Sequence, residues 1–196
     1  GGWQTVPGNN IHLIWSADNG ATFDEFGSHV PPYPYPDPSW DDNLALTSFS
    51  TGNTDGMPMY VGGYLWQGPQ EHTGQVWRFN PESLTIPWTH VDFPDNHVTV
   101  LAASPDAGNV VWVGFKKMAN NIPGYATLLE VHVVAGGSFQ WVPRWTSNGM
   151  VHEENYTIRD IQVAMTNAFS TDVVLTLDTP QENVAGVDHT IVKRWA

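Results

Sequence analysis

Apolar and polar residues alternate over short distances along most of this chain, and residues that favour turns separate the alternating runs. A period of two is typical of half-buried strands, whereas a helical period is hard to find anywhere. The best helical candidate, residues 159–169, fits a strand followed by a turn equally well. The pattern predicts strands at residues 2–6, 11–16, 22–26, 44–49, 59–66, 75–80, 88–93, 98–104, 110–117, 126–134, 139–145, 157–165, 173–178 and 190–196.

Most of the predicted strands fall into groups of four. Residues 44–93 hold four strands, residues 98–145 hold four more, and residues 157–196 hold three. Four-stranded antiparallel sheets that recur every 40 to 50 residues or so are typical of β-propellers. We therefore expect one all-β domain over residues 1–196, a β-propeller with about 3.5 to 4 blades. A β-sandwich is the alternative, because it also uses many short strands.

The third group lacks a fourth strand, and residues 1–6 are the candidate to supply it. Propellers avoid open sheet edges, and one chain terminus commonly completes the blade that the other begins. Two architectures follow: a compact ring of about four blades closed in this way, or part of a ring of about six to eight blades completed by a second chain. The abrupt start and end of the chain favour the second.

The segment between the second and third predicted strands has the composition of a tight turn. An Asp can accept hydrogen bonds from backbone N–H groups there, and a Gly can adopt a positive φ. The segment resembles the Asp-box (BNR repeat) of the sialidase-like β-propellers in Ser16, Asp18, Gly20, Thr22 and Phe23. The resemblance implies a structural turn between the third and fourth strands of a blade, on the side away from the ligand face. Residues 104–109 match the box only in part, and we expect a turn between first and second strands there.

Charge and composition exclude several classes of function. The net charge is −13 and Lys and Arg together number only 7, which argues against nucleic acid and anionic membrane surfaces as partners. The chain has no Cys, so disulfides and thiolate metal sites are excluded. No apolar run is long enough to cross a bilayer. The His residues lack the spacing of metal ligands, and we expect no metal and no cofactor.

A proline-rich loop is the first candidate ligand site. Prolines stiffen residues 31–43, and aromatic rings stand beside carboxylates within the loop. Sugars stack their apolar faces on rings while their hydroxyls bond to carboxylates. The alternative is a polyproline-like loop packed on the surface or against a partner. The candidate residues are Tyr33, Tyr35, Trp40, Asp41 and Asp42.

The second candidate ligand site precedes and enters an innermost strand. His152, Glu153, Arg159 and Asp160 gather many polar groups where propeller ligands usually bind. The alternative is a solvated loop with a structural Arg159–Asp160 interaction. A third polar segment, residues 67–74 with His72, is expected to be the loop between the second and third strands of its sheet.

Three functions remain open at this point. The first is a non-catalytic propeller that binds a glycan or a protein partner, in a secreted or cell-envelope setting. The second is a glycoside hydrolase of the Asp-box kind that uses paired carboxylates. A full sialidase site is not expected, because Arg78 and Arg194 occupy similar structural places between apolar residues and the R-I-P motif of that family is absent. The third is a structural scaffold subunit of an assembly. No catalytic residue is assigned.

Overall fold

Strands account for nearly all of the regular structure that is described. The computed structural model describes residues 3–6, 10–15, 24–25, 43–51, 58–68, 71–79, 88–105, 108–167, 170–178 and 191–195. Each predicted strand corresponds to one observed strand, and residues 159–167, the helical alternative, belong to a strand. The elements are β1 (Trp3–Val6), β2 (Asn10–Trp15), β3 (Asp24–Glu25), β4 (Asn43–Thr51), β5 (Met59–Gly68), β6 (Glu71–Phe79), β7 (Trp88–Pro94), β8 (Asn96–Ala103), β9 (Val110–Ala119), β10 (Ile122–Val133), β11 (Phe139–Thr146), a 3-10 turn η2 (Glu153–Asn155), β12 (Thr157–Asn167), β13 (Ser170–Asp178) and β14 (Ile191–Trp195).

The strands form antiparallel sheets in which each strand pairs with the next one along the chain. Two sheets have four strands, β4-β5-β6-β7 and β8-β9-β10-β11, and two have three, β1-β2-β3 and β12-β13-β14. The predicted groups of four, four and three are therefore confirmed. The turn predicted at residues 104–109 does join a first strand to a second, and its Ser104 N–H donates to the Val110 carbonyl at 2.9 Å.

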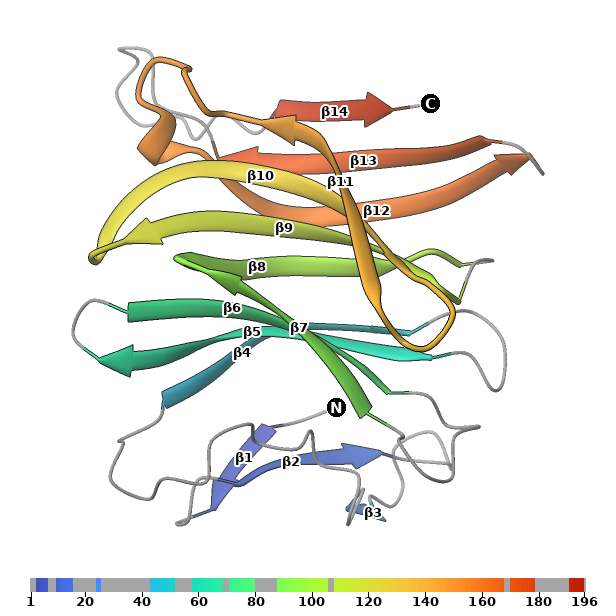
Figure 1. Ribbon diagram of the computed structural model, residues 1–196. Helices are drawn as coiled ribbons and strands as arrows, with labels where there is room; N and C mark the ends of the chain where they lie inside the picture. The colour runs from blue at the N-terminus through green and yellow to red at the C-terminus, as the bar shows by residue number, and fades with distance from the viewer. Residues whose placement is uncertain are drawn as a thin grey trace.

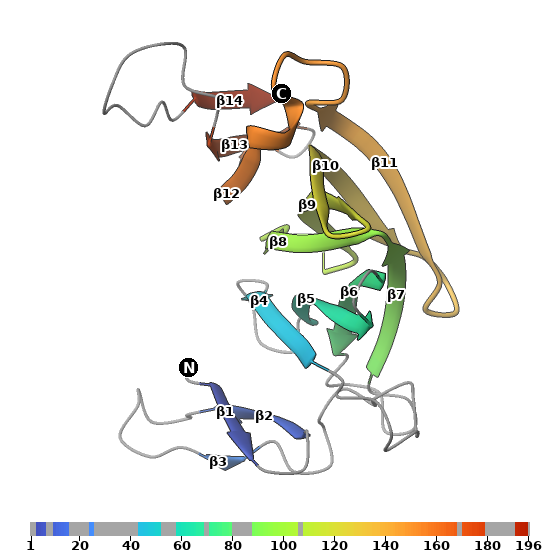
Figure 2. The same ribbon diagram turned by 90° about the vertical axis from the view of Figure 1, so that its left-hand side faces the viewer.

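The N-terminal strand was the candidate to complete the last sheet, but it does not do so. β1 pairs with β2 in a local hairpin in which Val6 lies opposite Asn10, and closing so short a connection costs little chain entropy. β1 and β14 lie at opposite ends of the molecule in both views (Figures 1 and 2). The described strands form antiparallel sheets, and their pairings do not close into a ring.

Three of the sheets stack face to face, with β8–β11 in the middle (Figure 1). Their first strands are neighbours, since β8 packs against both β4 and β12. Figure 2 shows β4, β8 and β12 toward one side of the stack and β7 and β11 toward the other. We call the contact between sheets β4–β7 and β8–β11 the first junction, and that between β8–β11 and β12–β14 the second junction.

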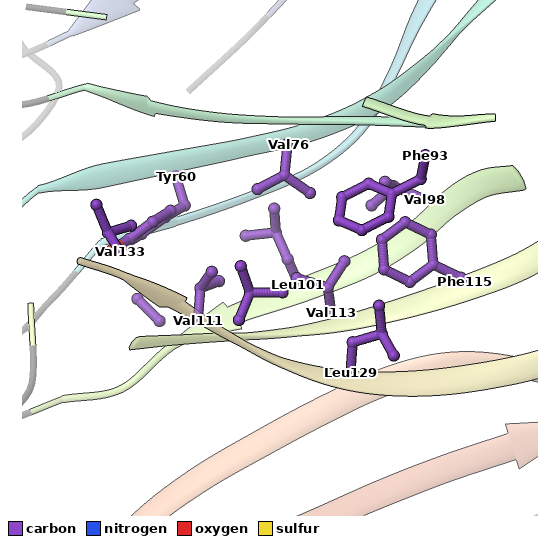
Figure 3. Close-up of a cluster of buried hydrophobic side chains, with 12 residues drawn as sticks. Tyr60, Val76, Phe93, Val98, Leu101, Val111, Val113, Phe115, Leu129 and Val133 are labelled. Atoms are coloured by element: carbon purple, nitrogen blue, oxygen red, sulfur yellow. The ribbon is translucent and has the colours of Figure 1, made fainter. Parts of the chain in front are cut away.

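An apolar cluster fills the first junction (Figure 3). The rings of Phe93 and Phe115 meet there with centroids 4.5 Å apart. Close approach of the sheets needs Gly74, because a Cβ at that position would lie 2.8 Å from the Asn96 carbonyl oxygen. The buried cluster consists of Tyr60, Val76, Phe93, Val98, Leu101, Ala103, Val111, Val113, Phe115, Leu129, Val131 and Val133.

Side-chain hydroxyls of β4 also bond to the backbone of β8. Thr47 donates to the Val98 carbonyl at 2.6 Å. The Ser50 hydroxyl accepts the Ala103 N–H at 2.9 Å, and Ser48 accepts another β8 amide in the same way. These bonds satisfy backbone groups of β8 across the sheet faces and tie the two first strands together.

The second junction has a smaller apolar core on the other face of the central sheet. It consists of Trp112, Ala126, Leu128, Ile158, Ile161, Val173, Leu175 and Leu177. Strand β9 contributes to both cores, with residues of odd number facing the first junction and Trp112 facing the second. This alternation explains why β9 reads as a nearly continuous apolar run: both of its faces are buried.

No helix among the described residues is long and apolar enough to cross a membrane.

Candidate functional site: the loop before strand β12

The connection from β11 to β12 passes from the central sheet to the third sheet and is folded on itself. Ser147 is buried, and its Oγ accepts the Ala126 N–H at 2.9 Å while its own N–H donates to the Ala126 carbonyl. The Gly149 N–H donates to Glu153 Oε2 at 2.5 Å, and Gly149 has φ of 80°. The Glu153 carbonyl in turn accepts a hydrogen bond from Ser147 Oγ at 3.3 Å. Residues 147–156, the β11–β12 loop, are therefore anchored at both ends by hydrogen bonds.

Lys116 of β9 anchors the second half of this loop. Its Nζ donates to the carbonyls of Glu154 and Tyr156, each at 2.5 Å, and the residue is only 8% exposed. Burial lowers the pKa of the Lys116 ammonium, although the carboxylate of Glu154 acts in the opposite direction. A charged donor shared by two carbonyls holds the loop against the central sheet.

His152 and Glu153, predicted as ligand residues, both lie on this loop but do different things. His152 adopts the left-handed conformation with φ of 54° immediately before η2. Its side chain is 65% exposed, and its Nδ1 lies 3.4 Å from Glu154 Oε1. Glu153, by contrast, has its carboxylate turned back onto the Gly149 amide. His152 is thus available to a ligand, whereas Glu153 shapes the loop.

Arg159 and Asp160, the other two predicted ligand residues here, lie inside β12. Arg159 sits at a register shift between Ile158 and Asp160. Its Nε donates to Asp178 Oδ2 of β13 at 2.5 Å, while Asp160 accepts from Gln162 Nε2 at 2.8 Å. The expected Arg159–Asp160 interaction is therefore wrong, because Arg159 pairs across strands and Asp160 pairs along its own strand.

Two aromatic rings stand beside the loop. Trp145, near the end of β11, and Tyr156, the last residue of the loop, have ring centroids 6.3 Å apart with their planes inclined by 57°. Both residues are partly buried. Both rings also pack against the apolar core of the second junction, and aromatic rings with fixed polar groups nearby are a combination that sugar-binding sites use.

The other predicted site residues lie outside the described residues. They are Tyr33, Tyr35, Trp40, Asp41 and Asp42 of the proline-rich loop, and Ser16, Asp18, Gly20, Thr22 and Phe23 of the Asp-box segment.

The sequence pattern missed a second polar cluster, at the first junction. Glu71 and His72 were expected in a loop, but β6 begins at Glu71, so that expectation is wrong for both. His72 is 5% exposed and its Nδ1 lies 2.7 Å from His97 Nε2. A signal was present, because His72 continues the period-two face of Gly74 and Val76, which are buried against the central sheet.

The described residues contain no group of three His, Cys, Asp or Glu side chains placed to hold a metal ion. Comparison with models of protein families, with curated proteins and with solved structures gave no match to this chain.

Proposed function

We propose that the stacked sheets are blades of a β-propeller in a secreted or cell-envelope protein, and that the chain binds a glycan, or failing that a protein partner, without catalysing a reaction. The meander of each sheet and the neighbouring first strands β4, β8 and β12 support the propeller. The resemblance of residues 16–23 to the Asp-box of the sialidase-like β-propellers also supports a propeller. A crystal structure in which the sheets surround a common axis is the result expected; two face-packed layers would overturn the propeller.

The observation that carries the binding function is the β11–β12 loop. Its backbone is fixed by Lys116 and Ser147, so its exposed groups are held in place before a ligand arrives. A preorganised surface loses little entropy on binding. His152 is exposed on the loop, Arg159 follows on β12 shortly after the loop ends, and the rings of Trp145 and Tyr156 lie at its two ends.

Glycan is favoured over protein because of this pairing of rings and polar groups. A sugar ring presents an apolar face and a rim of hydroxyls, and binding sites for such ligands combine aromatic side chains with a few fixed polar groups. The glycoside hydrolase alternative draws less support here, because Glu153 is engaged by the Gly149 amide and Asp160 by Gln162. The scaffold alternative stays a prediction.

A glycan array tests the binding function. We expect hits for the unaltered chain that weaken about tenfold or more in Arg159→Gln, a loss of about 1.4 kcal/mol. Arg144→Gln is the matched control, since Arg144 is also an exposed arginine paired to a carboxylate, Glu130, but lies on β11. Hits that are equally strong in both variants would remove Arg159 from the site.

The same protein preparations also distinguish the hydrolase from the protein-binding and scaffold functions. Release of reducing ends from polysaccharides, lost on neutralising an acidic residue, would favour the hydrolase. An array without hits would remove the glycan and leave the protein partner or the scaffold to be tested.

A further inference from the structure

Two histidines from different sheets meet at one end of the first junction. His72 belongs to β6 and His97 to β8, and their rings lie 4.6 Å apart at an angle of 57°. His97 also stacks on Tyr64 of β5 with centroids 3.6 Å apart and planes inclined by 8°. The imidazole of His97 is therefore enclosed between two rings of the neighbouring sheet.

The hydrogen bonds define where the protons are. The His72 Nε2 contacts the side-chain oxygen of Asn121, in the turn between β9 and β10. An amide oxygen only accepts, so His72 Nε2 carries a proton, and in the neutral ring its Nδ1 is then an acceptor. His97 Nε2 donates to this Nδ1 at 2.7 Å. The chain of bonds runs from His97 through His72 to Asn121 when both rings are neutral.

Protonation is unfavourable at this position for two reasons. The first proton places a charge in a buried site between sheets, and the second places two cations within hydrogen-bond distance of each other. Charged groups on the neighbouring elements have other partners. The Asp95 carboxylate pairs with Lys117 at 3.3 Å, and the Lys116 ammonium is turned to the carbonyls of the β11–β12 loop.

Two backbone hydrogen bonds lie at the same end of the junction. The Asp95 N–H donates to the His72 carbonyl at 2.7 Å, and the Met118 N–H donates to the Asp95 carbonyl at 2.8 Å. They connect β6 through the β7–β8 turn to β9. Because Asp95 is bonded to β6 on one side and to β9 on the other, separation of the two sheets at this end cannot keep both bonds, while the Ser50–Ala103 bond between β4 and β8 can remain.

We propose that His72 and His97 form a pH-sensitive latch, which keeps this end of the first junction closed while both rings are neutral and opens it in acid. Burial, and then the neighbouring His72, lower the pKa of His97 from 6.5 to about 4. A histidine in an opened junction titrates near 6.5, so the opened form binds more protons between pH 6.5 and pH 4. The contribution of His97 is complete above pH 6.5 and is lost as the pH falls toward 4.

Amide hydrogen exchange between pH 7 and pH 4.5, corrected for intrinsic rates, tests the latch. We expect protection at Asp95 and Met118 to fall about tenfold more than protection at Ala103, which reports on the other contact of the same junction. In His97→Gln, which keeps a donor near the position of Nε2 but does not titrate, this selective fall should disappear. His132→Gln is the control, because His132 is partly buried against Glu130 away from the junction.

Two results would overturn the latch. One is an equal fall in protection at Asp95 and Ala103 in the unaltered chain. The other is a selective fall that persists in His97→Gln. If that variant does not fold, NMR titration of the unaltered chain decides: His97 must titrate well below 6.5, the ordinary value for a histidine, and a midpoint near 6.5 would exclude the latch.

Discussion

The first and second junctions share strand β9, which sends Val113 and Phe115 into one and Trp112 into the other. The first core includes a pair of phenylalanine rings, and the second is dominated by aliphatic residues of β12 and β13. Both are buried, so a simple alternation of apolar residues provides both at once.

The polar groups of the two junctions differ more than their cores. At the first, hydroxyls of Ser48 and Ser50 and the imidazoles of His72 and His97 join the sheets. At the second, the ammonium of Lys116 donates hydrogen bonds to carbonyls of the β11–β12 loop. Neutral groups bury at little electrostatic cost, whereas a buried ammonium pays for its desolvation even when it is well bonded.

The comparison indicates that apolar and polar contacts have different roles in the two junctions. Apolar alternation brings the sheets together in either junction, and the polar contacts determine which strands lie opposite each other and how each junction responds to pH. A substitution in one core should therefore open that junction first and leave the other protected.

Removal of a core side chain is expected to have the largest effect. Phe115→Ala should lower the free energy of unfolding by about 3 to 5 kcal/mol and Ile158→Ala by about 2 to 5, because each leaves a cavity in a fully packed site. Urea unfolding measures both values. Hydrogen exchange should then show loss of protection in β4–β7 for Phe115→Ala and in β12–β14 for Ile158→Ala. Identical exchange patterns would contradict the independence of the junctions.

Substitution of Gly74 and of Gly114 compares how closely the sheets approach each other at the first and at the second junction. A Cβ at Gly74 would lie 2.8 Å from a backbone oxygen, whereas one at Gly114 would lie 3.0 Å from side-chain atoms of Ile158 and Val100. Side chains adjust more readily than backbone, so we expect Gly74→Ala to cost about 2 to 3 kcal/mol and Gly114→Ala about 1. Thermal unfolding measures the loss of stability in each variant. A larger loss in Gly114→Ala than in Gly74→Ala would show that the first junction can widen.

The alternation of residues was sufficient to predict the strands and their grouping. Val111, Val113 and Phe115 already mark β9 as a strand, and turn-forming residues separate it from β8 and β10. Residues 159–167 remained ambiguous between helix and strand on local pattern alone. The pairing of β12 with β13, the next strand along the chain, decides for strand.

The polar contacts could not be predicted in the same way. Arg159 lies in β12, the first strand of its sheet, but its partner Asp178 comes from the next strand and depends on register. His72 was assigned to a loop because Gly and Pro surround residues 67–70, yet the connection is short and the strand resumes at Glu71. Partners such as His97 lie 25 residues away, and no local pattern specifies such a contact.

Replacement of Lys116 tests the polar closure of the second junction. Lys116→Met leaves two loop carbonyls without their charged donor but also removes a buried charge, so we expect a net loss of only about 1 kcal/mol. Exchange at Asn155 and Tyr156 should increase, with the first junction unchanged. Because burial lowers the pKa of Lys116, the unaltered chain gains stability from this group as the pH rises toward 10.5 and Lys116→Met does not. A constant difference between pH 7 and pH 10 would contradict this account.

The smallest effect on stability is expected at the exposed ion pair between two strands of the third sheet. Arg159 and Asp178 have side chains that are 63% and 42% exposed, and ion pairs in water contribute between zero and about 1 kcal/mol. Arg159→Gln should therefore shift the midpoint of thermal unfolding by no more than a degree or two at about 0.3 kcal/mol. A large loss of stability would mean that Arg159 supports the second junction, and that a loss of glycan binding in this variant reports on folding. A negligible loss, together with weaker binding, would separate the ligand surface from the two cores that hold it.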